Sequence, residues 1–285
     1  MYKSILCPVS GDPSDRAQLD LAAAVAKRFA ANVAVLHVKS DARDATPYLG
    51  EGMSPALISE FLETAEREAN ARAGRARTMF ESWARDCDLA LRDAPSLVDG
   101  ASCAWRLESG SADKWIARLG RVADLTVVSV PGEASIGNTL IFEAALLDTA
   151  HGVLLAPPSF AGPVDGPVVI AWNASVEASR AVAAAMPLIA AARSVHIVSI
   201  DEPGKPFDAT PLATHLGWHR IASELRATTL SDRHVAEALL DECHTLGASL
   251  LVMGGYTHSR FREMIFGGVT QHLIRHAPLP VLMAH

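Results

Sequence analysis

The sequence has few cysteines, few aromatic residues and no long apolar run. Four cysteines occur among 285 residues, and aromatic residues make up 6% of the chain. The cysteines show no pair spacing typical of a metal site, so we expect reduced, mostly structural thiols in a cytoplasmic protein. They are Cys7, Cys87, Cys103 and Cys243.

A membrane-spanning helix needs roughly 18 uninterrupted apolar residues, and no segment of the sequence reaches that length, so we expect no membrane association. The net charge of −7 gives no general attraction to nucleic acid. Any affinity for phosphate must therefore come from a local site. The first eight residues lack the long apolar core of a signal peptide, and we expect a first strand there instead.

Short apolar runs alternate with segments whose apolar residues recur at helical spacing, and this order occurs twice. Between the two series lies 157–167, with four prolines and two glycines, which is the best linker candidate. Asp12 or Ser14 can cap the first helix, and Ser175 can cap its counterpart in the second series. We predict strands at 3–9, 32–38, 102–107, 125–130, 152–156, 168–172, 194–200, 223–229, 250–253 and 280–284, and helices at 15–30, 55–86, 112–123, 139–150, 176–191, 209–219, 232–246 and 268–276.

The two series also resemble each other in sequence, since 5–10 lies over 168–173 and 123–128 lies over 248–253. A duplicated α/β domain is the economical interpretation. We predict two tandem Rossmann-like or flavodoxin-like domains, each a five-stranded parallel sheet with helices on both faces. The predicted boundaries are 1–158, a linker at 159–167, and 168–285. The terminal strands 152–156 and 280–284 should lie near a pseudo-two-fold interface between the domains.

A glycine-bearing loop follows the apolar run 250–253. It contains Gly254-Gly255, then a basic segment, then Gly267-Gly268 at the start of a helix-like segment. Glycine lets backbone N–H groups approach a ligand, and a helix N-terminus offers unpaired N–H groups with partial positive charge. Glycine spacing alone does not distinguish a phosphate-binding loop from glycines that only form turns and a tight helix start, and the two interpretations are about equally favoured. Ligands in parallel sheets bind at the carboxyl ends of strands, where this loop would lie.

The second half resembles a universal stress protein domain, and the whole chain resembles the tandem form of that family. The family motif is Gly, two residues, Gly, about nine residues, then Gly and Ser or Thr. Gly254 and Gly267 match the first and third glycines. Thr257 stands where the second glycine is expected, and Gly268 stands where the hydroxyl is expected.

The resemblance implies an adenine nucleotide alpha hydrolase-like fold and an ATP-like ligand in the second domain. In ATP-binding members an Asp ends the first strand, and Asn173 occupies that position here. The two departures imply weak or altered binding, in a cytoplasmic stress-response protein that is not a dedicated catalyst. The implied nucleotide-binding residues are Ala171, Asn173, Ile200, Met253, Gly254, Gly255, Thr257, His258, Gly267, Gly268, Val269 and Thr270. Two alternatives stay open: a module that binds a non-nucleotide ligand or protein partner, and a slow nucleotide hydrolase.

The first half departs further from the family pattern. Ser10 replaces the Asp, and the segment after 125–130 lacks the glycine motif, with Glu133 placed to repel phosphate. We therefore expect the first half to be a structural or partner-binding module. Its long helix at 55–86 is rich in Glu and Arg, which indicates either a solvated face with intrahelical ion pairs or a docking surface.

Other residue patterns give weaker indications. Arg260 and Arg262 could contact phosphate, although an exposed basic loop explains them slightly better. Two histidine pairs have the four-residue spacing that can hold a metal, but neither has an obvious third ligand, so we expect no metal site. The pairs are His215 with His219 and His272 with His276. No Ser/His/Asp combination lies in a recognisable nucleophile turn. An unknown protein partner and a homodimer are compatible with the sequence.

Overall fold

The computed structural model describes residues 1–41, 54–95, 100–131, 136–160, 162–201, 208–229, 235–255 and 268–285. Its strands form one sheet in the order β3-β4-β2-β1-β5-β6-β11-β10-β7-β8-β9. The strands are β1 (Ser4–Val9), β2 (Asn32–Lys39), β3 (Ala90–Leu91), β4 (Ser102–Ser109), β5 (Leu125–Ser129), β6 (Gly152–Ala156), β7 (Pro167–Ala171), β8 (Ser194–Asp201), β9 (Glu224–Thr229), β10 (Leu250–Gly254) and β11 (Val281–Ala284).

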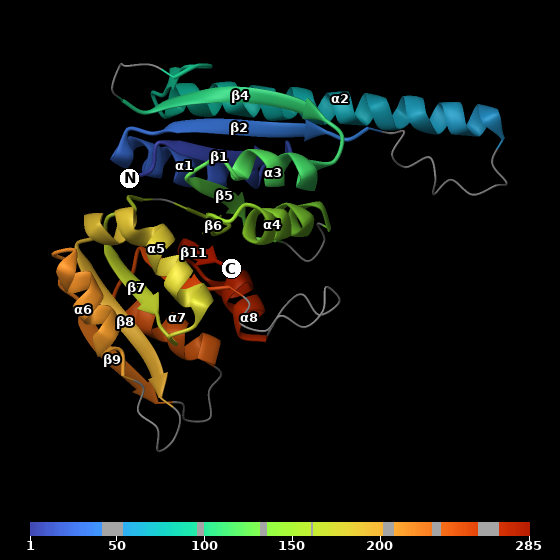
Figure 1. Cartoon of the computed structure of the whole chain (residues 1–285). Helices are drawn as coiled ribbons and strands as arrows, with labels where there is room; N and C mark the ends of the chain where they lie inside the picture. The colour runs from blue at the N-terminus through green and yellow to red at the C-terminus, as the bar shows by residue number, and fades with distance from the viewer. Residues whose placement is uncertain are drawn as a thin grey trace.

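Each half of the sheet is parallel, and the halves meet where β6 pairs antiparallel with β11. Apart from β3, the order in the second half mirrors that in the first. Each half thus has the Rossmann strand order, which confirms the predicted fold class. The strands of the first half run across Figure 1 and those of the second half run down it, as the twist accumulates.

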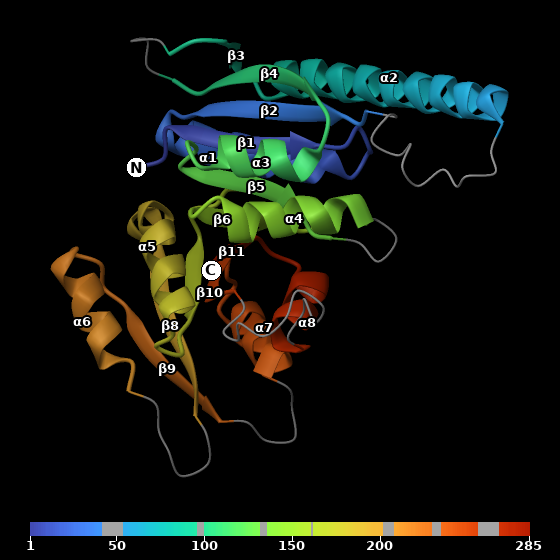
Figure 2. The same ribbon diagram turned by 45° about the vertical axis from the view of Figure 1, so that its right-hand side comes forward.

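The described helices cover both faces of the sheet (Figures 1 and 2). On one face α1, α2, α5 and α6 pack against a single buried cluster, and on the other α3, α4, α7 and α8 pack against a second. Both clusters include residues of both halves, so the core is continuous across the antiparallel joint. The helices are α1 (Asp15–Phe29), α2 (Pro55–Asp86), α3 (Ala112–Gly120), α4 (Ile136–Asp148), α5 (Val176–Ala191), α6 (Thr210–Trp218), α7 (Val235–Thr245) and α8 (Gly268–His276).

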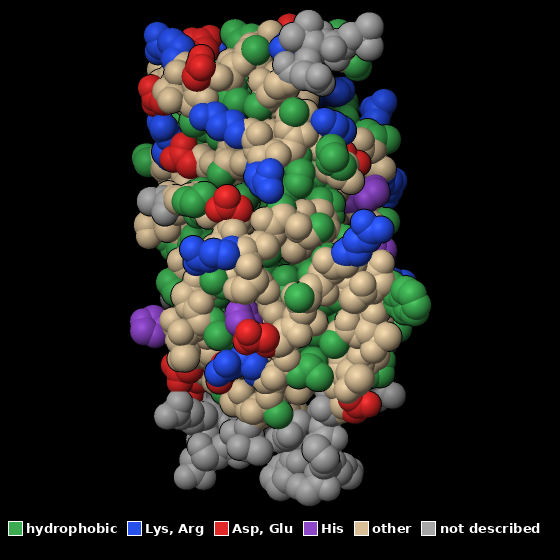
Figure 3. All heavy atoms as spheres, turned by 90° about the vertical axis from the view of Figure 1, so that its left-hand side faces the viewer, with side chains coloured by type: hydrophobic (Ala, Val, Ile, Leu, Met, Phe, Trp, Pro, Cys, Tyr) green, Lys and Arg blue, Asp and Glu red, His purple; other side chains and the backbone are tan. Residues whose placement is uncertain are grey.

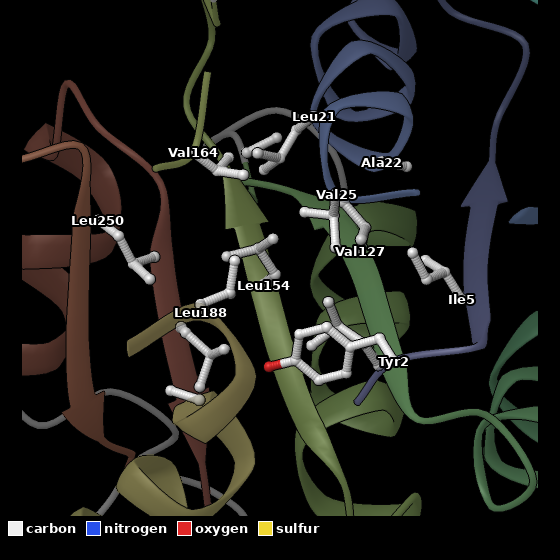
Figure 4. Close-up of a cluster of buried hydrophobic side chains, with 14 of the residues drawn as sticks. Tyr2, Ile5, Leu21, Ala22, Val25, Val127, Leu154, Val164, Leu188 and Leu250 are labelled. Atoms are coloured by element: carbon white, nitrogen blue, oxygen red, sulfur yellow. The ribbon is translucent and has the colours of Figure 1, made fainter. Parts of the chain in front are cut away.

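The joint between the halves is packed by side chains from both. Tyr2, at the start of the chain, donates a hydrogen bond of 2.6 Å from Oη to the carbonyl of Ala184 in α5. A Cβ on Gly152 of β6 would lie 2.8 Å from the Cβ of Ala184, so α5 packs directly on the joint. Figure 4 shows Leu154 between Tyr2 and Leu188, with side chains of both halves around them. The two halves therefore share one packed interior.

Helix α2 lies along β4 and projects past the sheet (Figures 1 and 2). Ser54 caps it by accepting a hydrogen bond from the backbone N–H of Leu57 at 3.3 Å, and Pro55 occupies its first turn. Ala76, Phe80 and Trp83 bury the C-terminal part, because they recur at helical spacing. The ion pair between Arg77 and Glu81 lies on the exposed face, as the solvated-face interpretation predicts.

Most predicted elements are present within a few residues, and two details differ. The first half has an additional strand, β3, so its sheet has six strands rather than five. Ser14 makes no side-chain capping bond at α1, and the N–H groups of Asp15 and Arg16 donate instead to the backbone carbonyls of Asp12 and Pro13. The segment predicted as a linker is docked in part, since Val164 is buried in the core. The domain boundaries themselves stay a prediction.

Candidate functional site

The carboxyl ends of three strands meet at one edge of the second half. β7 pairs with β8 up to Ala171 and with β10 up to Ile170, which aligns the three strand ends. Four of the predicted site residues lie there, at or directly next to the ends of their strands: Ala171, Ile200, Met253 and Gly254. The order β8-β7-β10 makes this edge a topological switch point, because β8 and β10 lie on opposite sides of β7, and ligands of such folds bind at that point.

Asn173 lies in the turn between β7 and α5, at the same edge. Its Oδ1 accepts a hydrogen bond from the backbone N–H of Ser175 at 3.1 Å, and Ala174 between them has a φ of +55°. The Oγ of Ser175 accepts from the N–H of Ala178 at 3.1 Å and so caps α5, which confirms Ser175 as the N-cap. Asn173 is exposed, so its amide remains within reach of a ligand.

Gly254 is required by packing. A Cβ at this position would lie 2.6 Å from the backbone nitrogen of Ala178 and 2.9 Å from the carbonyl carbon of Glu177, both in the first turn of α5. Absence of a side chain therefore lets the end of β10 touch the capped end of α5. A close ligand is not needed to explain this glycine.

Gly255 has a different role from the one predicted. Its N–H donates to the carbonyl of Ala284 at 2.9 Å, so this N–H extends the pairing of β10 with β11 and is not available to a phosphate. A Cβ here would lie 3.2 Å from the ends of Leu146 in α4 and Met283 in β11. Gly255 thus lies where the two halves meet.

The remaining predicted site residues belong to the loop and to the start of α8. Gly268, Val269 and Thr270 form the first turn of α8, although the side chains of the latter two are not described. Thr257, His258 and Gly267, together with Arg260 and Arg262, lie outside the described residues.

The loop between β1 and α1, which is equivalent to the Asn173 turn of the second half, is filled by a carboxylate of its own. Asp15 is 2% exposed, and it accepts hydrogen bonds from the backbone N–H groups of Gly11 (2.7 Å) and Asp12 (3.1 Å) and from the hydroxyl of Ser10 (3.1 Å). Burial raises the pKa of Asp15 to about 6, although these donors work in the opposite direction. The donors that a ligand could use are therefore occupied from within the chain.

Helix α2 covers this loop. Gly11 has a φ of +91°, and a Cβ on it would lie 2.8 Å from the backbone carbonyl oxygen of Arg72 in α2. Beside it His37 is buried, with Nδ1 2.9 Å from the carbonyl oxygen of Val9, and burial lowers its pKa. Ser10 can be identified from the sequence, whereas the buried position of Asp15 cannot, because an Asp at a helix start usually lies in water.

A further polar group lies at the opposite, amino edge of the second half. The Oγ of Ser194 is 3.0 Å from Nε2 of His196, whose Nδ1 is 3.2 Å from Oε2 of Glu224. The order of atoms resembles a catalytic triad, but Nδ1 lacks hydrogen-bond geometry to the carboxylate, and Ser194 lies in a regular strand. We interpret the group as side-chain contacts that link the neighbouring strands β8 and β9.

Two hollows are found at the amino edges of the strands, away from the predicted site. One of about 690 Å³ is lined by the segment before β7, including Phe160 and Asp165, and by Arg193. Another of about 800 Å³ lies in the first half, between Lys3, Arg92 and Arg106. Basic and acidic side chains are interspersed over the face drawn in Figure 3, with no large field of one sign.

The described residues contain no group of three potential metal ligands. The rings of His215 and His219 lie 4.9 Å apart and those of His272 and His276 lie 4.2 Å apart, so each predicted pair shares a helix face. Among the described helices, none combines the length and apolar character needed to cross a membrane.

Solved structures of other proteins share this fold over nearly the whole chain. A universal stress protein from Archaeoglobus fulgidus DSM 4304 superposes with a TM-score of 0.67 at 16% identity, over 98% of this chain and 97% of its own. A functionally unknown protein from Pseudomonas aeruginosa PAO1 gives a TM-score of 0.55 at 12% identity, over 99% and 92%. A universal stress protein in complex with cAMP covers 55% of this chain and 98% of its own, but its TM-score of 0.32 and 18% identity do not carry its ligand over.

No curated protein matches the chain. The sequence pattern of the universal stress protein family matches residues 1–93 and 166–285, which is most of the chain and includes parts of both halves. The chain therefore belongs to the universal stress protein family.

Proposed function

We propose that this protein acts in the stress response in the cytoplasm and binds an adenine nucleotide, weakly or in altered form, at the carboxyl edge of its second half. The observation that carries the proposal is the contrast between the two equivalent edges. In the first half Asp15 fills the loop and α2 covers it. In the second half Asn173 is exposed beside the first turn of α5, with the strand ends of β7, β8 and β10 around it.

Within this proposal, Asn173 orients the base. Its amide group can donate to a ring nitrogen of adenine while Oδ1 keeps the turn closed through Ser175. The phosphates lie toward the start of α8, where the backbone N–H groups of Gly268 and Val269 are in the first helical turn. The lack of a hydroxyl at position 268 removes a donor worth roughly 1–2 kcal/mol, which accounts for weaker binding.

A second candidate is a module whose ligand is not a nucleotide. The packing role of Gly254 favours it, because this glycine is needed for contact with α5 whether or not a phosphate binds nearby. A slow nucleotide hydrolase is the third candidate, and it requires metal-dependent turnover that changes in the 254–270 loop abolish.

The first test identifies any ligand that the protein carries. Freshly purified protein is denatured, and the released small molecules are identified by mass spectrometry. The second test is a titration with ATP, ADP and AMP followed by thermal unfolding, since a ligand that binds the folded state raises Tm. We expect adenine nucleotides to raise Tm and Asn173→Ala to reduce the effect. The matched control is Ser10→Ala in the first half, which should leave it unchanged. If all three nucleotides leave Tm unchanged at saturation, the proposal is refuted.

The two departures from the family pattern provide a gain-of-binding test. The double variant Thr257→Gly, Gly268→Ser restores the second glycine and the hydroxyl. Return of one donor should tighten nucleotide binding roughly five- to thirtyfold, measured by isothermal titration calorimetry. A double variant that folds normally and binds no better would favour the non-nucleotide candidate.

A further inference from the structure

The sheet ends at β9, which is the last strand at this side among the described residues. Within the part of the chain that the structure describes, β9 pairs with β8 alone, and it is the last strand in the order. Leu225 in β9 is 49% exposed, and Trp218 at the end of the neighbouring α6 is 84% exposed. An edge strand offers unpaired N–H and C=O groups to another strand, and exposed large apolar side chains beside it mark an interaction site.

The side chains of β9 alternate between the two faces of the sheet. Glu224 and Arg226 are on the α7 face, since Arg226 Nε lies 3.0 Å from Oε2 of Glu242 in α7 and both belong to the same alternation. Leu225 points to the other face, where its register partner Ile197 packs in the same buried cluster as Leu216 of α6. The edge thus presents charges on one face and a leucine on the other.

We propose that β9 pairs antiparallel with β9 of a second copy of this chain, around a two-fold axis through Leu225. In that register the two Leu225 side chains lie opposite each other on the α6 face. Glu224 of each copy then lies opposite the partner's Arg226 on the α7 face, twice by symmetry. Opposite charges in directly facing positions stabilise an antiparallel pair, and like charges destabilise it.

Shifting the axis by one residue also keeps the α6 faces of both copies on the same side of the joined sheet, but the two registers that result bring like charges together. An axis through Glu224 sets two carboxylates against each other, and an axis through Arg226 sets two guanidinium groups against each other. An axis through Ala227 leaves Leu225 opposite Thr229. The charges of Glu224 and Arg226, together with the pairing of the two Leu225 side chains, therefore favour the register centred on Leu225, since a shift of the axis changes every facing pair.

Helix α6 lies outermost beside β9 in Figures 1 and 2. The axis through Leu225 would bring α6 of the second copy to the same face, on the far side of the axis. The exposed Trp218 ends α6 and the half-buried Ile221 follows it, so apolar residues flank the start of β9. This apolar flank adds contact area to a short strand pair, and it is the reason that we expect a dimer of moderate, concentration-dependent stability.

The test is sedimentation velocity of the full chain from low to high micromolar concentration. We expect a reversible dimer, and Leu225→Glu should weaken it about tenfold or more, because the change places two carboxylates on the axis. The matched control is Leu107→Glu in β4, since Leu107 is 51% exposed in the first half and should leave the dimer unchanged. Circular dichroism and thermal unfolding establish that each variant is folded.

A charge exchange tests the register and does not depend on Leu225. All its proteins carry Glu242→Gln, so that the intrachain pair with Arg226 is not a variable. Glu224→Arg should weaken the dimer, and addition of Arg226→Glu should restore it. Because Glu224→Arg also removes the contact of Glu224 with His196 within the chain, circular dichroism and thermal unfolding first establish that these variants are folded. A chain that stays monomeric at every concentration overturns the proposal. So does a dimer that neither Leu225→Glu nor Glu224→Arg weakens, because that dimer uses another surface.

Discussion

Replacement of Gly254 by alanine tests whether this glycine serves the fold or a ligand. The added Cβ would lie 2.6 Å from the backbone nitrogen of Ala178 and 2.9 Å from the carbonyl carbon of Glu177. Both atoms belong to the backbone of α5, so no side-chain rotation can relieve the contact. Either β10 or the first turn of α5 has to move, and the move disturbs the cap that Ser175 provides.

The expected cost follows from that contact. Overpacking in a well-packed region costs about 1–3 kcal/mol, and loss of a cap adds up to about 1 kcal/mol. We therefore expect Gly254→Ala to lower the free energy of unfolding by about 1–4 kcal/mol in urea denaturation without nucleotide. The φ of Gly254 is not in the left-handed region, so the effect comes from the contact alone.

Two other glycines complete a graded series. Gly255→Ala would bring a Cβ within 3.2 Å of Leu146 Cδ2 and Met283 Cε, which are flexible side-chain ends, so we expect a loss below about 1 kcal/mol. Gly217 in α6 has nothing within 4 Å, and Gly217→Ala should stabilise by about 0.5–1 kcal/mol through helix propensity. Equal stability of Gly254→Ala and the parent protein would refute the packing role, and the nucleotide role would become the better explanation.

Three further changes have defined expectations. Burial raises the pKa of Asp15 from 3.8 to about 6, so the folded state binds this proton more tightly than the unfolded chain. Stability relative to Asp15→Asn should therefore fall by up to about 3 kcal/mol as pH rises from about 4 to about 6, and stay level above pH 7, in urea titrations of both proteins. Tyr2→Phe leaves the carbonyl of Ala184 without its 2.6 Å partner and should cost about 1–2 kcal/mol by the same method, whereas no loss would contradict a role for this bond at the joint. Gly11→Ala should lower Tm by several degrees in calorimetry, because of its φ of +91° and its 2.8 Å approach to Arg72; an unchanged Tm would show that α2 is not closely packed on the loop.

The sequence predicts the repeated architecture well, because the physical signals are local. Apolar runs of strand length and helical periodicity place α2, α5, β6 and α8 at their observed bounds. The repeated order of elements also predicts that the terminal strands β6 and β11 lie near the interface between the halves, and the structure pairs them. The strand β3 could not be predicted, since Ala90 and Leu91 are both exposed and two residues show no alternation.

The candidate site is predictable only in part, for a physical reason. Strand ends can be placed from the sequence, so Ala171, Ile200 and Gly254 are correctly placed at one edge. The hydrogen-bond partners of individual backbone and side-chain groups cannot be predicted in this way, because they depend on three-dimensional contacts. The N–H of Gly255 bonds to Ala284, and the carboxylate of Asp15 turns inward to fill a loop. Neither hydrogen-bonding arrangement can be recognised from the type or spacing of the residues.

The antiparallel joint has a consequence for synthesis of the chain. β6 has its backbone groups satisfied on one side by β5, and on the other side by β11, which is made about 120 residues later. Translation at about 5–20 residues per second leaves the outer edge of β6, a fully apolar strand, without its partner for on the order of ten seconds. The first half of the nascent chain therefore exposes an unpaired, aggregation-prone strand edge until β11 leaves the ribosome. Chaperone dependence of folding should concentrate in that interval, and a chain truncated before β11 should aggregate through β6.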